Sequence, residues 1–251
     1  MISNFHDGAF YNADCFDIMR RLPAGCVDMI LCDLPYGTTQ NKWDSVLPLD
    51  KLWAEYWRVA KPDAAIVLTA AQPFTAQLVM SQLGAFRYEW IWYKTRKTGN
   101  LNAKKRPMLA HETVLVFFRS QPTYVPYTDE DNPLAGVRAT PTLTPNYGGI
   151  EGQNDYVRPD KLTKHSVLSG FDVGNERGLH PTQKPVTLFE YLIKTYTNEG
   201  QIVLDNTAGS GTTAIAARNT GRKWICIEKD PDYFAKAVAR VRATEKVSAD
   251  A

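Results

Sequence analysis

An acidic residue followed closely by an aromatic one can hold a planar amine. The segment Asp33-Leu34-Pro35-Tyr36 directly follows the apolar run 29–32, and we take it as the candidate catalytic segment. The Asp33 carboxylate and the backbone carbonyl of Leu34 can accept hydrogen bonds from an amine, and the charged acceptor is the stronger one. The ring of Tyr36 offers a stacking face worth about 1–3 kcal/mol to an extruded base. The same pattern is equally typical of a plain strand-to-turn exit.

A glycine turn near the other end of the chain can hold a nucleotide-like cofactor. The segment 205–213 reads Asp-Asn-Thr-Ala-Gly-Ser-Gly-Thr-Thr and follows the apolar run 202–204. Gly209 and Gly211 remove side chains that would block a ligand, and the helix start supplies free N–H groups. Glu228, one strand further, can accept from both ribose hydroxyls. An NAD site needs a third glycine and a phosphate loop needs Gly-Lys-Ser/Thr, and the segment has neither. S-adenosylmethionine is therefore the remaining common ligand. The alternative is a tight turn that binds no ligand.

Short apolar runs that alternate with amphipathic stretches must position both motifs. We expect strands over Ala9–Ala13, Val27–Cys32, Ala64–Thr69, Tyr88–Tyr93, Thr113–Phe118, Ile202–Leu204 and Trp224–Ile227. We expect helices over Leu47–Arg58, Pro73–Leu83, Val186–Tyr196 and Thr212–Asn219. Such alternation predicts an α/β fold with a doubly wound, mostly parallel sheet.

The middle of the chain has a different composition. Residues 121–179 hold 7 of the 16 glycines and 6 of the 15 prolines, and no helical period survives there. A structureless stretch of this length inside a compact domain is usually functional, which favours an insertion that grips a large substrate. The alternative is a poorly ordered linker, although tyrosines such as Tyr124 and Tyr127 are uncommon in linkers.

The charge distribution and the cysteine content indicate the cellular compartment and the kind of partner. The net charge is only +2, but one stretch holds six basic residues and no acidic one, and it can contact phosphates or simply be a solvated loop: Lys94, Arg96, Lys97, Lys104, Lys105 and Arg106. The four cysteines form no Cys-x-x-Cys pair and the histidines are scattered, so we expect free thiols, no metal and a cytoplasmic location. No apolar stretch is long enough to cross a membrane. We expect His111-Glu112, ahead of a strand, to be structural.

The motifs together resemble the β-group of DNA amino-methyltransferases of the adenine-N6 type. Asp33 to Tyr36 matches the family's Asp-Pro-Pro-Tyr motif, 205–213 matches its Phe-x-Gly-x-Gly motif, and their order is that of the circularly permuted β-group. The resemblance implies a seven-stranded sheet, with a catalytic half (1–120), a target-recognition insertion (121–179) and a cofactor-binding half (180–251). It also implies double-stranded DNA as the partner; the family often dimerises, although the residues identify no interface. Contacts to S-adenosylmethionine would come from Asp14, Cys15, Asp33, His180, Thr182, Lys184, Asp205, Thr207, Ala208, Gly209, Ser210, Gly211, Thr212 and Glu228.

Two departures from the family pattern keep alternatives open. Leu34 stands where the family has its first proline, and Thr207 stands where it has phenylalanine, which removes an apolar contact to the cofactor. These departures are the only support for a DNA-binding remnant without activity. Cytosine-N4 methylation is the alternative to adenine-N6 methylation among the enzymes. Cytosine-C5 methylation is disfavoured because no cysteine follows a proline, and the motif order disfavours methylation of RNA or of protein glutamine.

Overall fold

The computed structural model describes residues 1–37, 44–139, 156–172 and 183–249, which divide into two compact units. The first unit comprises residues 1–124 and 166–251, and the second comprises residues 125–165. Two of the expected cofactor residues, His180 and Thr182, lie outside the described residues.

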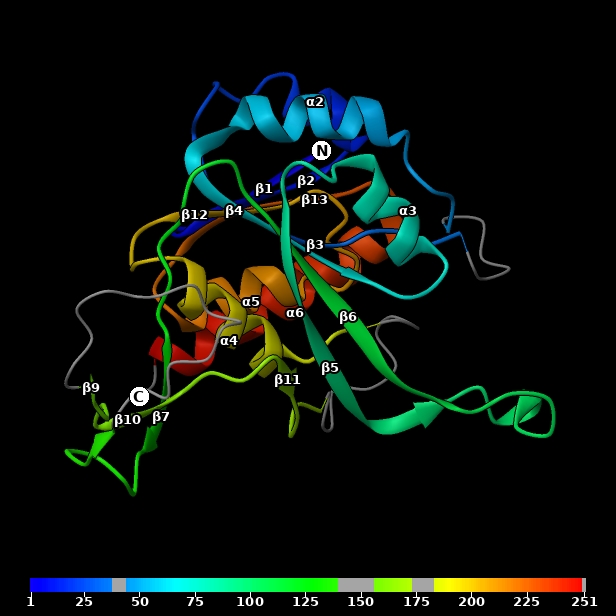
Figure 1. The fold of residues 1–251 in the computed structure, drawn as a ribbon. Helices are drawn as coiled ribbons and strands as arrows, with labels where there is room; N and C mark the ends of the chain where they lie inside the picture. The colour runs from blue at the N-terminus through cyan, green and yellow to red at the C-terminus, as the bar shows by residue number, and fades with distance from the viewer. Residues whose placement is uncertain (38–43, 140–155, 173–182, 250–251) are drawn as a thin grey trace. The chain divides into compact units, whose positions relative to one another are not determined.

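The first unit is built on one nine-stranded sheet (Figure 1). Five neighbouring strands, from β2 to β4, run parallel, and β11 is parallel to β5. The other three pairs are antiparallel: β1 with β2, β4 with β6, and β6 with β5. The expected mostly parallel α/β sheet is confirmed, and two short edge strands, β1 and β11, add to the seven expected ones. The spatial order is β1 (Ile2–Asn4), β2 (Gly8–Asn12), β13 (Lys223–Glu228), β12 (Ile202–Asp205), β3 (Val27–Asp33), β4 (Ala60–Ala70), β6 (Leu109–Phe117), β5 (Phe86–Thr98) and β11 (Val167–Leu168).

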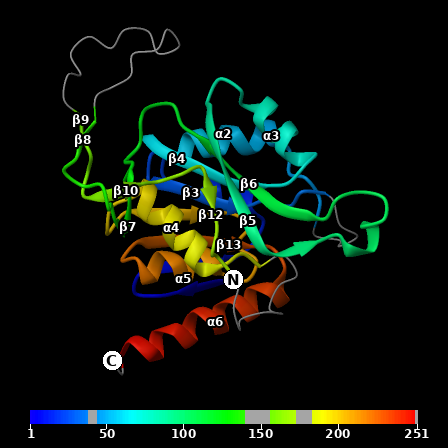
Figure 2. The same ribbon diagram turned by 60° about the horizontal axis from the view of Figure 1, so that its bottom comes forward.

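Helices cover both faces of this sheet (Figure 2). One face carries α1 (Cys15–Met19), α2 (Leu49–Val59) and α3 (Phe74–Ser81), and the other carries α4 (Val186–Tyr196), α5 (Thr212–Asn219) and α6 (Pro231–Ala249). Successive side chains of a strand point to opposite faces. Accordingly, Met29 and Leu31 of β3 pack with the second set of helices, and Ile30 and Cys32 pack with the first. A strand that is buried on both faces has a continuous apolar sequence, and residues 29–32 of β3 form such a run.

The strand register brings the two sequence motifs to one edge of the sheet. Met29 of β3 pairs with Val203 of β12, so β12 ends at Asp205 and β3 ends two residues further along, at Asp33, on the same edge of the sheet. On the far side of β12, β13 ends at Glu228, which pairs with Asn12 at the end of β2. Ligands of doubly wound folds bind at the carboxyl ends of parallel strands, and these ends converge here.

Helices α1 and α6 were not among the helices expected from sequence. Asp14 caps α1, since its Oδ1 accepts from the backbone N–H of Phe16 at 3.0 Å. Asp230 caps α6 by accepting from the backbone N–H groups of Asp232 and Tyr233, and Pro231 takes the first helical position. Both starts therefore had a readable Asp cap. Within the described parts of the chain, no helix has the length and apolar character needed to cross a membrane.

The second unit consists of two small antiparallel ladders. One pairs β7 (Tyr127–Asp131) with β10 (Lys161–Thr163), and the other pairs β8 (Arg138–Ala139) with β9 (Tyr156–Val157). Asn132 closes the first ladder, because its backbone N–H donates to Asp160 and its side-chain amide donates to Pro159. The unit covers the middle of the segment 121–179, whose role in target recognition stays a prediction.

Candidate active site

A large cavity opens at the carboxyl edge of the sheet in the first unit. It measures about 1420 Å³, which exceeds the roughly 300–1,000 Å³ of most small-molecule sites and leaves room for a cofactor and a nucleobase together. The candidate catalytic residues Asp33, Leu34, Pro35 and Tyr36 all line it. Among the expected cofactor residues that the structure describes, all but Gly211 line it too, namely Asp14, Cys15, Asp33, Lys184, Asp205, Thr207, Ala208, Gly209, Ser210, Thr212 and Glu228.

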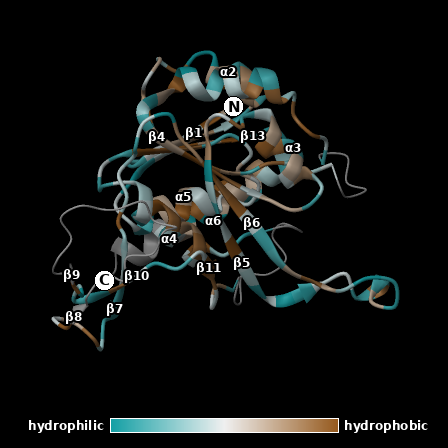
Figure 3. Cartoon of the chain, in the orientation of Figure 1, coloured by the Kyte–Doolittle hydropathy of each residue, from teal (hydrophilic) through white to brown (hydrophobic). Residues whose placement is uncertain are grey.

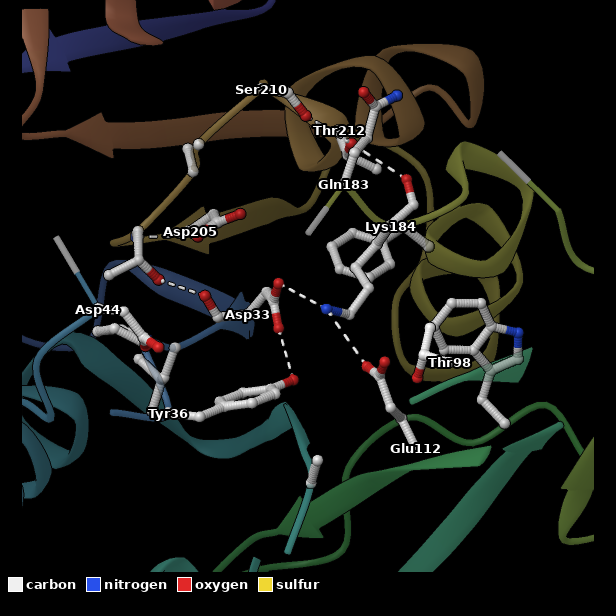
Figure 4. Close-up of a pocket in the computed structure, with 18 of the residues that line it drawn as sticks. Asp33, Tyr36, Asp44, Thr98, Glu112, Gln183, Lys184, Asp205, Ser210 and Thr212 are labelled. Atoms are coloured by element: carbon white, nitrogen blue, oxygen red, sulfur yellow. Dashed lines mark hydrogen bonds and ion pairs between the residues drawn. The ribbon is translucent and has the colours of Figure 1, made fainter. Parts of the chain in front are cut away.

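Both oxygens of Asp33 are already engaged in this cavity (Figure 4). Oδ1 accepts a hydrogen bond from the Tyr36 hydroxyl at 2.7 Å and another from the Thr69 hydroxyl. Oδ2 accepts from the ammonium of Lys184 at 2.6 Å. The Tyr36 hydroxyl in turn lies 3.2 Å from the Thr69 oxygen. The carboxylate is therefore held in one orientation by three side chains from three segments of the chain.

A row of alternating charges continues from Asp33 across the cavity wall. Lys184 Nζ also lies 3.3 Å from Oε2 of Glu112, and Glu112 Oε1 accepts from Lys94 at 3.1 Å. Burial alone would lower the pKa of Lys184, but the attraction of Asp33 and Glu112 outweighs it and raises that pKa. Burial likewise opposes ionisation of Glu112, yet Lys184 and Lys94 bring the Glu112 pKa below its ordinary value. All of these effects favour the charged forms of Lys184 and Glu112.

Tyr36 is held from two directions at the start of the loop that follows β3. Its ring stacks on Phe74 with centroids 5.5 Å apart and an interplanar angle of 23°. Burial, followed by the nearby Asp33 carboxylate, raises the Tyr36 pKa, so its hydroxyl stays protonated and donates. Next to it, Gly37 has a φ of 68° that favours glycine, and its N–H donates to Asp44 Oδ1 at 2.8 Å.

Glu228 supports the glycine turn. Its Oε2 accepts from the backbone N–H of Gly209 at 2.9 Å, and its Oε1 accepts from Asp230 at 2.8 Å. Burial raises the Glu228 pKa despite these two bonds. Gly211 has a different role from the one its spacing suggested. Its φ is 77°, and a Cβ there would lie 3.3 Å from Ala237, so this glycine serves backbone conformation and core packing, and it clears no space for a ligand.

The glycine turn and the catalytic strand are joined by a direct bond. The Thr207 hydroxyl donates to the backbone carbonyl of Asp33 at 3.1 Å. The family's phenylalanine could not make this contact, so the departure at this position adds a polar link between the two motifs. Asp205 also stabilises the glycine turn, because it accepts hydrogen bonds from the backbone N–H of Thr207 at 3.0 Å and from the Thr213 hydroxyl.

Asp205 predicts a pH dependence of stability. Burial raises the Asp205 pKa to about 7. A carboxyl whose pKa is raised on folding contributes stability that is present below the unfolded pKa, near 4, and is lost as pH rises through about 7. The free energy of unfolding of Asp205→Asn should therefore rise relative to that of the wild type, by about 2 kcal/mol from pH 5 to pH 8. Urea unfolding at both pH values measures this. Asp63→Asn, at an exposed position, is the control and should show no such gain; equal gains would refute the assignment.

Unpartnered polar groups in the cavity wall indicate that a ligand belongs there. Among the described residues, Trp92 Nε1 and both amide atoms of Gln183 are buried without a hydrogen-bond partner, and both residues line the cavity. Buried polar atoms are normally satisfied, so such groups require a partner that the chain itself does not provide. Near the other wall, burial raises the pKa of Cys15, whose thiol therefore stays neutral. The donor and acceptor set fits a nucleoside with an amino-acid tail.

The six basic residues of the sequence run separate into two environments. Lys94 is buried and bonded to Glu112 and Thr98, so its charge serves the cavity. The remaining five are exposed and lie toward the tip of the hairpin formed by β5 and β6, which carries the short helix η1 (Asn100–Asn102). The tip is hydrophilic, in contrast to the apolar central strands (Figure 3). The five are Arg96, Lys97, Lys104, Lys105 and Arg106.

Sequence reasoning missed four residues that line or support the site. The sequence predicts a structural role for Glu112, places Thr69 and Trp92 only in strands, and places Gln183 only within the cofactor-binding half. The positions of Thr69, Glu112 and Trp92 depend on strand pairing. Thr69 lies opposite Asp33 in the β3–β4 ladder, and Glu112 lies opposite Trp92 in the β5–β6 ladder. A polar residue in an otherwise apolar strand was the available signal for Thr69 and Glu112.

The fold and the cavity are those of a methyltransferase acting on an amine. Residues 27–239 match the family model described as DNA methylase, in the group of N6 and N4 amino-methylating enzymes, and the chain belongs to this family. The family expected from the two motifs is thereby confirmed, as is the class of enzyme, a DNA methyltransferase.

Individual relatives cover nearly the whole chain. DNA adenine methyltransferase YhdJ of Escherichia coli (strain K12) is 27% identical over 261 residues, which is 95% of this chain and 84% of that protein. The crystal structure of the M1.HpyAVI–SAM complex covers 92% of this chain and 98% of its own, at 24% identity and a TM-score of 0.64. The PvuII DNA methyltransferase, described as cytosine-N4-specific, covers 94% and 87% at 17% identity and a TM-score of 0.65. The two solved structures share the fold with this chain.

Proposed function

We propose that the protein transfers a methyl group from S-adenosylmethionine to the N6 amine of a flipped-out adenine in double-stranded DNA. The observation that carries this proposal is that Asp33 and the glycine turn open onto one cavity and are joined by the Thr207 bond. The similarity to YhdJ favours adenine as the target.

The residues of the catalytic segment would hold and activate the target amine. The Asp33 carboxylate and the Leu34 carbonyl accept from the two N–H groups, which raises electron density on the nitrogen. Tyr36 provides the stacking face, and Phe74 behind it keeps that face in place. S-adenosylmethionine, when bound, supplies an already activated methyl group, so the main task of the protein is alignment of the reacting atoms.

The residues around the glycine turn would hold the cofactor. Each Glu228 oxygen accepts one backbone N–H, and a carboxylate has about four acceptor sites, so capacity remains for ribose hydroxyls. Asp14 and Cys15 border the cavity beyond the end of β2 and suit the adenine end of the cofactor. Trp92 and Gln183 lack partners and suit its polar amino-acid tail.

The hairpin tip is the proposed contact with the DNA backbone. Changing Lys104 and Lys105 together to Gln should weaken duplex binding by about tenfold near 0.1 M salt. The slope of the logarithm of the binding constant against the logarithm of the salt concentration should become shallower by about 2. Fluorescence anisotropy of a labelled duplex over a salt series measures both quantities. The matched control changes Lys194 and Lys223, which are exposed on the first unit away from the hairpin. Equal losses in the two double variants would contradict a specific role for the hairpin.

Nucleoside identification tests the proposed reaction. Unmethylated duplex DNA is incubated with the protein and labelled S-adenosylmethionine, digested, and analysed by mass spectrometry. N6-methyladenine supports the proposal, N4-methylcytosine supports the alternative within the same family, and no methylated nucleoside contradicts both. Single-stranded DNA and RNA in parallel reactions test the choice of a duplex.

Three further expectations accompany this proposal. The four cysteines are free, in keeping with a reducing compartment, and we infer that the reaction takes place in the cytoplasm. The segment 121–179 is proposed to read the target sequence. A homodimer, expected from the family resemblance, is tested by sedimentation.

A further inference from the structure

The ammonium of Lys184 lies where the proposed target amine has to bind. Lys184 Nζ is 2.6 Å from Oδ2 of Asp33, while Oδ1 already accepts from the hydroxyls of Tyr36 and Thr69. The same ammonium is 5.6 Å from the centroid of the Tyr36 ring, the proposed stacking face. Oδ2 is therefore the Asp33 oxygen that is open to a base, and the Lys184 ammonium competes there with the N–H group that the base presents.

A neutral amine displaces an ammonium poorly. An ion pair with a carboxylate carries charge on both partners, whereas the exocyclic amine of a base offers only a polarised N–H. Lys184 is 5% exposed, so water cannot easily solvate the charge once it leaves Asp33. Displacement becomes favourable only if a second anion within reach accepts the ammonium.

Glu112 is that second anion. Its Oε2 lies 3.3 Å from Lys184 Nζ, farther than the 2.6 Å that separates Nζ from Asp33. Its other oxygen is held by Lys94, which also contacts Thr98, and this fixes the side chain with Oε2 toward Lys184. Among the described residues, no hydrogen bond of good geometry reaches Oε2. An acceptor is therefore ready on the side of Lys184 away from Asp33, as Figure 4 shows.

We propose that Glu112 is a positioning residue that receives the Lys184 ammonium when the target base enters and so frees Oδ2 of Asp33 for the amine. The inference rests on the proposed function of the same site. Before a base enters, Lys184 holds the Asp33 carboxylate in place. During the exchange the ammonium always has a carboxylate within reach, and no covalent bond changes.

Glu112→Gln tests this role, since glutamine keeps the size of the side chain and removes its charge. Without the second anion Lys184 stays on Asp33, and kcat for methyl transfer to DNA should fall by about 10- to 100-fold, the loss typical of a misplaced reacting group. The KM for DNA and the cofactor Kd should change by less than about twofold, because phosphate contacts and the glycine turn are untouched. Single-turnover transfer and calorimetry measure these quantities.

A second change separates positioning from simple support of the fold. The double variant Glu112→Gln/Lys184→Gln removes one charge of each sign, and with the ammonium gone Asp33 is open to the amine. It should recover at least about tenfold in kcat over Glu112→Gln. If Glu112 were only structural, the second change would bring no recovery. Glu112→Gln with wild-type kcat, or a double variant no faster than the single one, overturns the proposal.

Two measurements keep the test decisive. Melting temperatures are recorded for every variant, and Glu112→Asp, which keeps the charge, should retain more of kcat than Glu112→Gln; the reverse order also overturns the proposal. If the wild type transfers methyl groups to DNA and Glu112→Gln is equally active, this inference is wrong and the proposed function stands. No transfer by the wild type on any DNA tested defeats the proposed function, and the inference with it.

Discussion

Asp33→Asn should lower kcat for methyl transfer by about 10³-fold or more while leaving cofactor affinity nearly unchanged. Asparagine keeps the volume of the side chain and one acceptor oxygen, so the contacts with Tyr36 and Thr69 can persist. It loses the negative charge that pairs with Lys184 and that would strengthen the bond to the target N–H. Transfer of labelled methyl groups to DNA measures the rate, and calorimetry measures the cofactor Kd.

The control for this prediction is a second loss of a carboxylate away from the cavity. Asp63→Asn lies on an exposed part of β4 and should leave transfer unchanged. If Asp33→Asn retained the wild-type rate, the carboxylate would have no part in the reaction. A loss of cofactor binding in Asp33→Asn would instead assign Asp33 to the cofactor half of the cavity.

Gly8→Ala should destabilise the protein by about 3 kcal/mol, a loss at the upper end of the typical range for overpacking. Gly8 pairs with Trp224 across β2 and β13, and the indole of Trp224 is 1% exposed. A Cβ at Gly8 would overlap both this ring and the backbone oxygen of Trp224. Neither can move freely, because Trp224 packs against Phe5 and Phe10 and its backbone belongs to the sheet.

Thermal unfolding measures this effect, and a decrease of about 6–12 °C in the melting temperature corresponds to the expected loss. Gly84→Ala is the matched control, since a Cβ there meets no atom within 4 Å and the position is exposed. Its melting temperature should stay within about 2 °C of wild type. Equal shifts in both variants would show that the Trp224 contact is not the cause.

The sequence was sufficient for features that depend on local pattern. Residues 29–32 of strand β3 are buried on both faces and form a continuous apolar run, which predicts the strand, and Asp33 marks its end. Helix α4 was found because its apolar residues recur at helical spacing behind Pro185. Both motifs reached one cavity because parallel strands end at a common edge, a rule that needs only the strand order.

Features that depend on pairing between distant segments could not be found in this way. Glu112 faces Lys184 because β6 inserts between β4 and β5, and no local pattern contains that order. Lys94 reads as one of six similar cations, yet its place in the β5–β6 ladder buries it beside Glu112. Gly211 reads as a ligand-facing glycine, whereas its neighbours Ala237 and Phe10 come from opposite ends of the chain.

The neighbouring position of β3 and β12 has a consequence for synthesis of the protein. Strand β3 leaves the ribosome before its partner β12, which follows about 170 residues later. At typical translation rates of about 5–20 residues per second, one edge of an apolar strand waits about 10–30 seconds for its partner. An unpaired apolar edge can associate with other chains. The nascent polypeptide therefore depends on rapid coverage by helices, or on a chaperone, until β12 has been translated.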